Sequence, residues 1–418
     1  MARSEWKPRR LDELGFLGRG KSRHRPRNDA SLYGGPYPFI QTADVMAADP
    51  YITSYSQTYS ELGFQQSKMW PPGTMCMTIA GANTAKTAIL KIEACFPDSI
   101  VGFIPDKSKS DLHFVKYSLD LLRDRFLSVS RGATQDNLGL EKILSFPIVA
   151  PDVDEQRRIA GILSAYDELM ENSQRRIRLL EAMARALYRE WFVHFRFPGH
   201  EKLPRVASPL GDIPQGWEVK EMREVADVID CLHSKKPSEC PDGPGIFLQL
   251  NNIGEGGKLD MSEQFRISAD DYARWTSRIE LQAGDCVITN VGRVGAVGQM
   301  PEGVKAAPGR NMTAIRPRAG RLTPTYLIEY LLSSHMTSEV AKKMDLGTIM
   351  DSLNVKGIVR LHVPCPPMEA MLKFESVARP MRKRIEVLVD QIQNLRRTRD
   401  LLLPRLLSGQ INLRRIKR

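Results

Sequence analysis

Residues 151–199, PDVDEQRRIAGILSAYDELMENSQRRIRLLEAMARALYREWFVHFRFPG, decide the fold of this chain. Apolar or small residues recur there at alternating spacings of three and four, close to the 3.5-residue average of a coiled-coil seam. Pro151 precedes the pattern and Pro198-Gly199 ends it, as expected for the limits of a helix. The pattern predicts a helix of roughly forty residues, about 60 Å long at 1.5 Å per residue. That length favours a rod, and an ordinary core helix is the alternative.

The chain carries this pattern twice. Residues 367–408 repeat the seam after a second Pro-rich stop and end it at Ser408-Gly409. Residues 132–138, GATQDNL, align with residues 347–353, GTIMDSL, and the same offset then holds without a gap to Leu187 and Leu402. Shorter matches precede this block: Trp6 with Trp217, Phe39-Ile40-Gln41 with Phe247-Leu248-Gln249, Gly73 to Cys76 with Gly284 to Val287, and Gly81 with Gly292. Agreement in several blocks in the same order indicates an internal repeat.

The regions ahead of the two helices mix short β-like runs with Gly/Pro turns and a single helical stretch each. The β-like runs are residues 38–41, 75–79, 100–104, 286–289 and 312–315. We therefore predict an α+β fold in which two similar domains are each followed by a long helix. The predicted parts are a first domain (1–150), a central helix (151–200), a second domain (201–366), a C-terminal helix (367–408) and a basic tail (409–418).

The composition indicates a globular protein with a polyanionic partner. The 418 residues are 42% apolar and 26% charged, which argues against wholesale disorder. The formal net charge of +11 favours nucleic acid as the partner, and a merely basic protein is the alternative. The charged N-terminus and the lack of a long apolar run predict a cytoplasmic protein without a membrane partner.

The six cysteines contain no C-x-x-C pair and are expected to be reduced thiols. Cys231, His233 and Cys240 suggest part of a zinc site, but no second ligand pair stands at a usable spacing. We therefore predict no metal and no cofactor.

Residues 15–22, GFLGRGKS, satisfy the P-loop pattern G-x-x-x-x-G-K-[ST]. A P-loop needs a buried strand before it and a helix after it. The segment before this one looks helical, and Pro26 stands where the following helix should start. A basic, Gly-rich loop near a DNA backbone is the better interpretation, because Arg and Lys neutralise phosphate without reading sequence.

Signatures of catalysis are missing elsewhere as well. The sequence has no N-P-P-Y or D-P-P-Y for adenine methylation and no G-x-G-x-x-G for S-adenosylmethionine. It also lacks a nuclease-like carboxylate–lysine cluster. We therefore predict a chain that is not an enzyme, and an enzyme with its own recognition domains is the alternative.

Basic and amide side chains on predicted turns are the candidate DNA contacts, because Arg and Asn/Gln pair bidentately with guanine and adenine edges. A solvated surface residue is the alternative for each one. The candidates are Arg19, Lys21, Arg23, Arg25, Asn83, Thr84, Lys86, Arg131, Gln135, Asn290, Arg293, Arg310 and Asn311.

Five stretches carry a resemblance to a known family: residues 18–26 (GRGKSRHRP), 33–41 (YGGPYPFIQ), 132–135 (GATQ), 186–199 (ALYREWFVHFRFPG) and 406–409 (LLSG). With them the chain resembles, over nearly its whole length, the specificity subunit of type I restriction–modification systems. The resemblance implies two target-recognition domains, each reading one half of a split, asymmetric DNA target. It also implies two long antiparallel coiled-coil helices that hold the domains a fixed distance apart with pseudo-twofold symmetry.

The partners implied by the resemblance are double-stranded DNA, modification (methyltransferase) subunits and a restriction (translocase–nuclease) subunit. The second half departs from the first where Ile349-Met350 replaces Thr134-Gln135, so that loop is not expected to contact DNA in the second domain. A coiled-coil adaptor without direct DNA readout is the alternative function.

Overall fold

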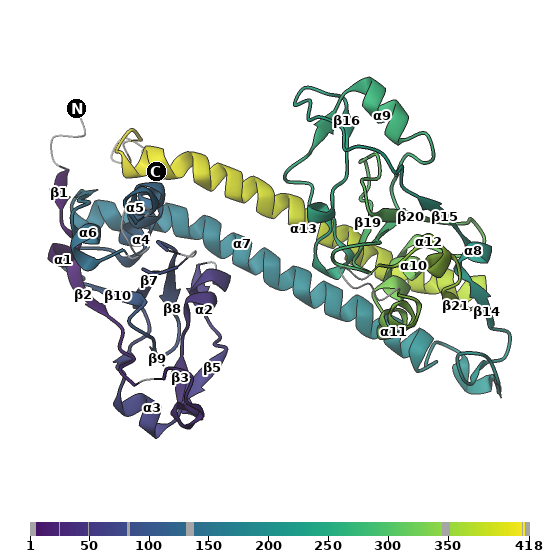
Figure 1. Cartoon of the computed structure of the whole chain (residues 1–418), viewed down its shortest axis with the longest axis horizontal. Coiled ribbons are helices and arrows are strands. Elements are labelled where there is room, and N and C mark those ends of the chain that lie inside the picture. Colours follow the sequence, from purple (N-terminus) through teal and green to yellow (C-terminus); the bar gives the residue numbers. More distant parts are fainter. Residues whose placement is uncertain are drawn as a thin grey trace. The chain divides into compact units, whose positions relative to one another are not determined.

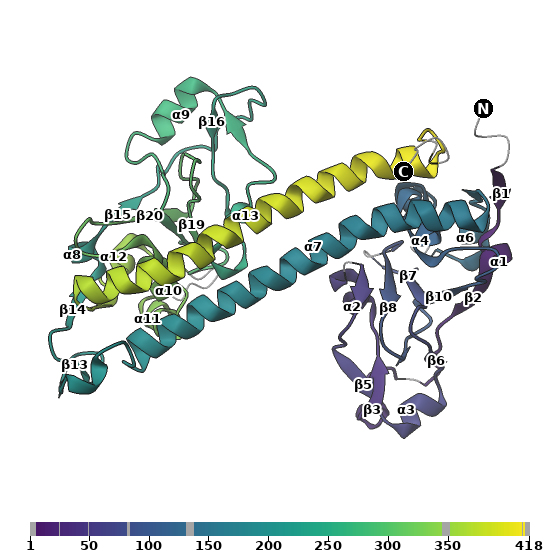
Figure 2. The same cartoon turned by 180° about the vertical axis from the view of Figure 1, so that it is seen from behind.

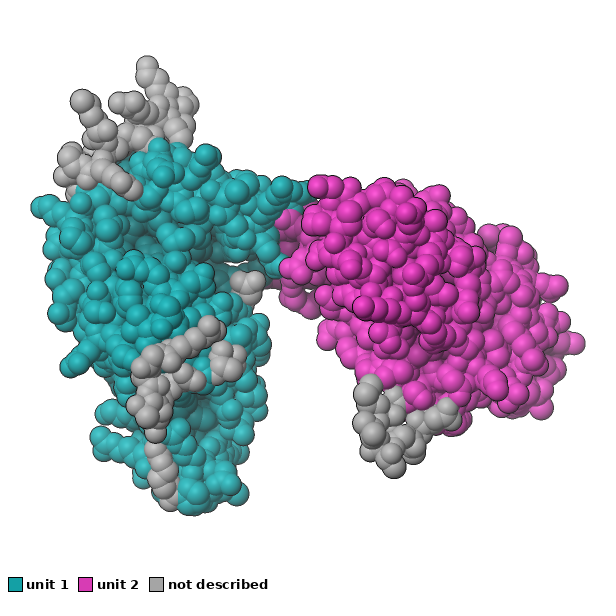
Figure 3. Space-filling view, turned by 45° about the horizontal axis from the view of Figure 1, so that its top comes forward, with its two compact units in different colours: residues 1–171, 394–418 teal, residues 172–393 magenta. Residues whose placement is uncertain are grey.

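The structure is a computed structural model that describes residues 6–24, 26–48, 50–81, 84–130, 138–344, 352–411 and 413. The chain divides into two compact units (Figure 3). Unit 1 is Met1–Glu171 with Asn394–Arg418, and unit 2 is Asn172–Gln393.

Unit 1 is built on a five-stranded sheet with the order β2-β10-β7-β8-β4 (Figure 1). Its strands are β2 (Gly15–Arg19), β10 (Ile100–Pro105), β7 (Met75–Thr78), β8 (Thr87–Leu90) and β4 (Tyr51–Ile52). Unit 1 also has a four-stranded sheet of order β5-β3-β9-β6. Its strands are β5 (Gln57–Tyr59), β3 (Tyr33–Phe39), β9 (Ala94–Cys95) and β6 (Met69–Trp70). A two-stranded ribbon pairs β1 (Lys7–Arg9) with β11 (Ile148–Ala150).

The helices of unit 1 are α1 (Leu11–Leu14), α2 (Thr42–Ala47), α3 (Glu61–Gln65), α4 (Leu112–Leu121), α5 (Arg123–Ser130) and α6 (Leu140–Leu144). All residues of β7 and β8 are buried, because helices cover the sheet. Phe103 of β10 and Phe114 of α4 share one core cluster with Ile159 and Leu406, which lie on the two long helices. The long helices are therefore part of the hydrophobic core.

Unit 2 repeats this plan with a four-stranded sheet of order β15-β20-β18-β19 (Figure 2). Its strands are β15 (Ala226–Asp230), β20 (Met312–Pro317), β18 (Cys286–Thr289) and β19 (Val297–Gln299). A ribbon pairs β14 (Glu218–Glu221) with β21 (His362–Cys365), and a second pairs β16 (Gly245–Ile246) with β17 (Arg266–Ile267). A short pair, β12 (Arg205–Val206) with β13 (Ile213–Pro214), precedes them. The helices are α8 (Met222–Val225), α9 (Ala269–Trp275), α10 (Pro324–Leu331), α11 (Ser334–Lys343) and α12 (Val355–Val359).

The two units agree in detail as well as in order. Gly73 and Gly284 both turn into the equivalent strands β7 and β18 with positive φ, at 83° and 88°. Gln41 and Gln249 each begin a short helix with a capping box, closed by Asp44 and Asn252. The internal repeat predicted from the sequence is therefore present in the backbone and its turns.

Two long helices, α7 (Val153–Tyr188) and α13 (Met368–Leu407), confirm the predicted pair of helices. A π-helical turn, Arg189–Val193, extends α7. In unit 1, Asp167 near the start of α7 pairs with Arg399 near the end of α13. In unit 2, Tyr188 at the end of α7 contacts Phe374 near the start of α13. The helices are therefore antiparallel, and apolar a/d-like positions such as Ile177 and Leu388 are buried.

Two local predictions were wrong. Each domain was expected to hold a single helical stretch, but short polar caps such as Ser60 and Ser333 begin further helices. The Gly-rich stretch was expected to be a loop, but Gly15–Arg19 is strand β2, paired along its whole length with β10. Within the described residues, no helix combines the length and apolar character that a membrane span needs.

Candidate nucleic-acid interface

Three loops of unit 2 meet at the end of β18 and form a junction around Asn290. The Asn290 N–H donates to the Asn311 carbonyl at 2.8 Å, and the Leu353 N–H donates to the Asn290 carbonyl at 2.8 Å. The Asn290 side-chain amide donates to the Leu353 carbonyl at 2.7 Å and to Thr313 Oγ1 at 3.0 Å. The turn after β18, the turn before β20 and the segment that leads into α12 are therefore tied together.

Unit 1 has the same junction at the end of β7. The Ile79 N–H donates to the Ser99 carbonyl at 2.9 Å, and the Leu138 N–H donates to the Ile79 carbonyl at 2.8 Å. Ile79, Ser99 and Leu138 thus occupy the positions of Asn290, Asn311 and Leu353. The backbone of the junction is shared, while the side chains that it carries differ between the units.

Unit 2 brings four of the predicted contacts to its junction: Asn290, Arg293, Arg310 and Asn311. Arg293 is exposed and its guanidinium donates to the Ile253 carbonyl at 2.8 Å. Arg310 is exposed and makes no side-chain hydrogen bond or ion pair with any residue that the structure describes. Asn311 has a positive φ of 62°, which Asn tolerates better than most residues. Asn290 does not fit its predicted role, because its amide is already bonded inside the protein.

Only two of the predicted contacts near the unit 1 junction can be placed. Thr84 is buried, and its hydroxyl donates to the Gly81 carbonyl at 2.7 Å, so it has no free polar group to offer DNA. Lys86 is half-buried at the start of the next strand, and its side chain remains a candidate. Arg25, Asn83, Arg131 and Gln135 lie outside the described residues.

A second group of predicted contacts forms a basic edge beside β2, made up of Arg19, Lys21 and Arg23. All three side chains are exposed, and none is in an ion pair with another described residue. The Gln66 side-chain oxygen accepts hydrogen bonds from the Arg23 and His24 N–H groups, and the Ser67 hydroxyl donates to the Lys21 carbonyl at 2.8 Å. The backbone of the basic edge is therefore fixed although its side chains are free to bind phosphate.

Two lysines that the sequence does not single out lie on aromatic rings. Lys68 Nζ is 4.6 Å from the ring centre of Phe16 and 4.0 Å from that of Trp70. In unit 2, Lys236 Nζ lies 4.0 Å from the ring centre of Phe265 and donates to Gln249 at 2.6 Å. Cation–π contacts orient such lysines. Lys68 and Phe16, and Lys236 and Phe265, are distant in the sequence, so no spacing pattern indicates these contacts.

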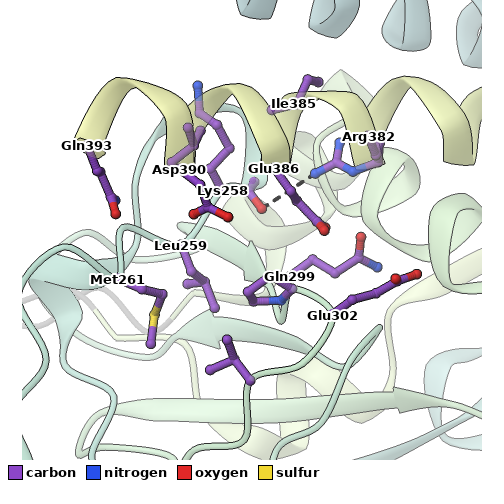
Figure 4. Close-up of a pocket in the computed structure, with 14 residues that line it drawn as sticks. Lys258, Leu259, Met261, Gln299, Glu302, Arg382, Ile385, Glu386, Asp390 and Gln393 are labelled. Carbon is purple, nitrogen blue, oxygen red and sulfur yellow. Dashed lines mark hydrogen bonds between the residues drawn. The ribbon is translucent and has the colours of Figure 1, made fainter. Parts of the chain in front are cut away.

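A cavity of about 120 Å³ lies in unit 2 between α13 and the segment after β19 (Figure 4). Its walls carry the carboxylates of Glu302, Glu386 and Asp390. Burial raises the pKa of Glu386. Arg382 in the wall donates to the Glu329 carboxylate at 2.7 Å and to the Gly257 carbonyl at 3.5 Å. None of the predicted DNA contacts lines this cavity, so the candidate DNA contacts are the junctions and the basic edge.

Comparison with known proteins gives the same family throughout. Residues 3–182 match the family described as the type I restriction modification DNA specificity domain. The MjaIX type I restriction enzyme specificity subunit of Methanocaldococcus jannaschii is 23% identical over 424 residues, covering 98% of this chain and 94% of the relative. The HindI specificity subunit of Haemophilus influenzae is 20% identical over 351 residues, covering 69% and 74%.

The fold also matches a solved structure. The S subunit of the type I restriction-modification system from M. genitalium superposes with a TM-score of 0.61 at 15% identity, covering 96% of both chains. The domain match, the relatives and the repeated architecture agree: residues 3–182 belong to the type I restriction modification DNA specificity domain, and the chain as a whole is similar to type I restriction–modification specificity subunits.

Proposed function

We propose that this chain reads a bipartite, asymmetric DNA target for a type I restriction–modification complex. The observation that carries the proposal is the pair of junctions, which share their backbone hydrogen bonds and differ in their side chains. Ile79 occupies in unit 1 the place of Asn290 in unit 2, and Ser99 the place of Asn311. Two domains with the same backbone at the junction but different side chains there suit two half-sites of different sequence.

In this proposal residues 1–150 and 201–366 are the two target-recognition domains, and the long helices with the basic tail (409–418) complete the scaffold. The three free cations of the basic edge support backbone binding in unit 1, because Arg and Lys bind phosphates without reading bases. Arg293 and Arg310 are the candidates for base contacts in unit 2, since Arg is the residue that most often reads guanine.

The modification and restriction subunits are the proposed protein partners, and the cytoplasm is the proposed location. We also propose that the chain has no catalytic centre and no cofactor. Support comes from β2, because Gly15–Arg19 is a paired strand and cannot wrap a phosphate as a P-loop does. Tight ATP binding by the purified chain that Lys21→Ala abolishes would contradict this part of the proposal.

The test is an exchange of one domain. Residues 1–150 are replaced by the equivalent domain of a family member with a different target, and the modification subunit of this system is supplied. Genome-wide mapping of modified adenines should show a change in one half of the target only. The reciprocal exchange of residues 201–366 should change only the other half. An exchange that alters both halves, or neither, would show that the domains are not independent readers.

A further inference from the structure

Three metal-binding side chains of different chemistry meet where β15 ends in unit 2. Asp230, Cys231 and His233 each offer one ligand atom, and these atoms all lie within 4.8 Å of one another. His233 Nε2 lies 2.7 Å from Asp230 Oδ2. In a tetrahedral zinc site with bonds of about 2.0–2.3 Å, ligand atoms lie roughly 3.3–3.8 Å apart, so small side-chain adjustments suffice.

The backbone beneath these side chains is fixed from two sides. Asp230 pairs with Thr313 in the β15–β20 ladder. The Arg278 guanidinium donates to the Cys231 carbonyl at 2.9 Å and to the Asp230 carbonyl at 3.4 Å. The backbone of Asp230 and Cys231 is therefore fixed by the sheet and by Arg278, while His233 lies in the segment that follows β15.

The thiol and the imidazole differ in exposure. Cys231 is buried, with 1% of its surface exposed. His233 is 68% exposed, so an ion has a path from solvent. All six cysteines of the chain are free thiols, which leaves Cys231 available.

We propose that Asp230, Cys231 and His233 bind one zinc ion, with water in the fourth position. A set of one sulfur, one imidazole nitrogen and one carboxylate oxygen suits Zn²⁺, whereas Mg²⁺ and Ca²⁺ require oxygen ligands. The sequence suggested Cys231, His233 and Cys240 as part of such a site. The structure instead gathers Asp230 with the first two, and Cys240 is not in the group.

The internal repeat supplies a natural comparison. Arg19, Gly20 and Ser22 occupy in unit 1 the positions of Asp230, Cys231 and His233, because β2 and β15 pair with β10 and β20 in the same register. None of the three unit 1 residues is a good zinc ligand. Among the residues that the structure describes, the site belongs to unit 2 alone, so one ion per chain is expected.

The test uses the full-length, untagged chain, stripped with a chelator under reducing conditions. Zn²⁺ is titrated against a chromophoric chelator, and Co²⁺ is titrated for its thiolate charge-transfer absorption. One ion per chain is expected, together with that absorption band. Cys231→Ser and His233→Ala should each weaken Zn²⁺ binding by at least about tenfold, and Cys231→Ser should remove the Co²⁺ band. Because His233 is exposed, His233→Ala tests the site even if Cys231→Ser fails to fold.

Cys240→Ser is the matched control, since this thiol lies close in sequence but outside the group. It should keep the wild-type affinity and the Co²⁺ band. The proposal fails if the wild-type chain binds less than one ion, if both ligand variants bind like the wild type, or if Cys240→Ser loses affinity equally. DNA plays no part in this measurement, so its outcome is independent of the proposed function.

Discussion

Asp167 and Arg399, 232 positions apart in the sequence, form a buried ion pair between α7 and α13, with Oδ1 and Nη1 2.6 Å apart. Their side chains are 3% and 18% exposed. The Tyr117 hydroxyl of α4 donates to the other carboxylate oxygen. Burial lowers the pKa of Arg399, but the hydrogen bond and charge of Asp167 outweigh that effect and raise it. One carboxylate thus joins the sheet domain of unit 1 to both long helices.

Asp167→Ala should destabilise unit 1 by about 3 kcal/mol, because the partly buried Arg399 keeps only the exposed Asp400 and the Tyr117 hydroxyl loses its acceptor. Urea unfolding monitored by circular dichroism measures the change. The double variant Asp167→Ala/Arg399→Met should recover much of the loss, since no buried charge is left unpaired. Asp154→Ala is the control, because that carboxylate lies on the same helix and is 76% exposed. Equal stability of Asp167→Ala and Asp154→Ala would refute the buried pair.

In unit 2 an ion pair, Arg382 with Glu329, takes the place of the Tyr117–Asp167 hydrogen bond of unit 1. Glu329 in α10 is equivalent to Tyr117 in α4, because each lies six residues after the N-cap of its helix. Arg382 in α13 is equivalent to Asp167 in α7 by the offset of the internal repeat. Arg382 Nη1 and Glu329 Oε1 are 2.7 Å apart, with side chains 11% and 1% exposed. Burial raises the pKa of Glu329 although Arg382 opposes the shift. The two units therefore hold their helices with non-interchangeable residue pairs.

Arg382→Asp should destabilise unit 2 by several kcal/mol, because it sets two buried carboxylates against each other. Adding Glu329→Tyr rebuilds the Tyr–Asp pair of unit 1 and should restore part of the stability. A urea double-mutant cycle measures the coupling between the two positions. Strictly additive effects of the two substitutions would mean that these side chains do not interact.

The free energy of unfolding of unit 2 should depend on pH through Glu339 of α11. Burial raises its pKa, but hydrogen bonds from His362 and Lys343 outweigh this and lower it to about 2, from an ordinary 4.5. A lowered folded-state pKa gives stability that is present above the unfolded value and lost as pH falls through the folded one. The difference in unfolding free energy between the wild type and Glu339→Gln should be on the order of 2 kcal/mol at pH 6 and shrink between about pH 4.5 and pH 2.

Glu369→Gln is the control for that titration, because Glu369 is exposed on α13 and its ion pair is with the exposed Lys373 on the same helix. Its variant should differ little from the wild type at any pH. A difference for Glu339→Gln that stays constant down to pH 2 would show that its carboxylate does not titrate as expected.

Gly20→Ala should destabilise unit 1 by about 1–3 kcal/mol, because a Cβ there would lie 2.2 Å from the Phe96 carbonyl oxygen and 2.4 Å from that of Pro97. The same change at Gly139, where nothing lies within 4 Å, should have little effect. Thermal melting of both variants gives the comparison. A normal melting temperature for Gly20→Ala would remove the close-packing role of this glycine.

Lys21→Ala should weaken DNA binding by the assembled complex uniformly across sequences. If Lys21 neutralises one phosphate, the slope of log affinity against log salt should fall in magnitude by about 0.9. Lys109→Ala is the matched control, because Lys109 is exposed in the same unit but paired with Asp106 at 3.0 Å. Binding isotherms over a salt series measure both slopes. An unchanged slope for Lys21→Ala would place the basic edge away from the DNA.

The sequence by itself determined the repeat, the two long helices and the resemblance to a known family. The long helices show apolar residues at alternating spacings of three and four. The repeat shows equivalent glycines, such as Gly81 and Gly292, and one constant offset over the second part of each repeat. The strands around Met75 and Cys286 were also visible, because short apolar runs between turn residues predict buried strands. The spacing of apolar residues is a local property of the sequence, so it predicts helices and strands without knowledge of the residues that pack against them.

The tertiary structure alone decided which side chains are free. Thr84 and Asn290 have the chemistry of DNA contacts, yet the fold directs their polar groups to carbonyls of the protein itself. Asp167 meets Arg399 only because two helices distant in sequence pack together. Asp230, Cys231 and His233 are near one another in sequence, but the pairing of β15 with β20 and the bonds from Arg278 fix the backbone of the first two. A hydrogen-bond partner across the core is a property of distance in space, and no spacing in the sequence encodes it.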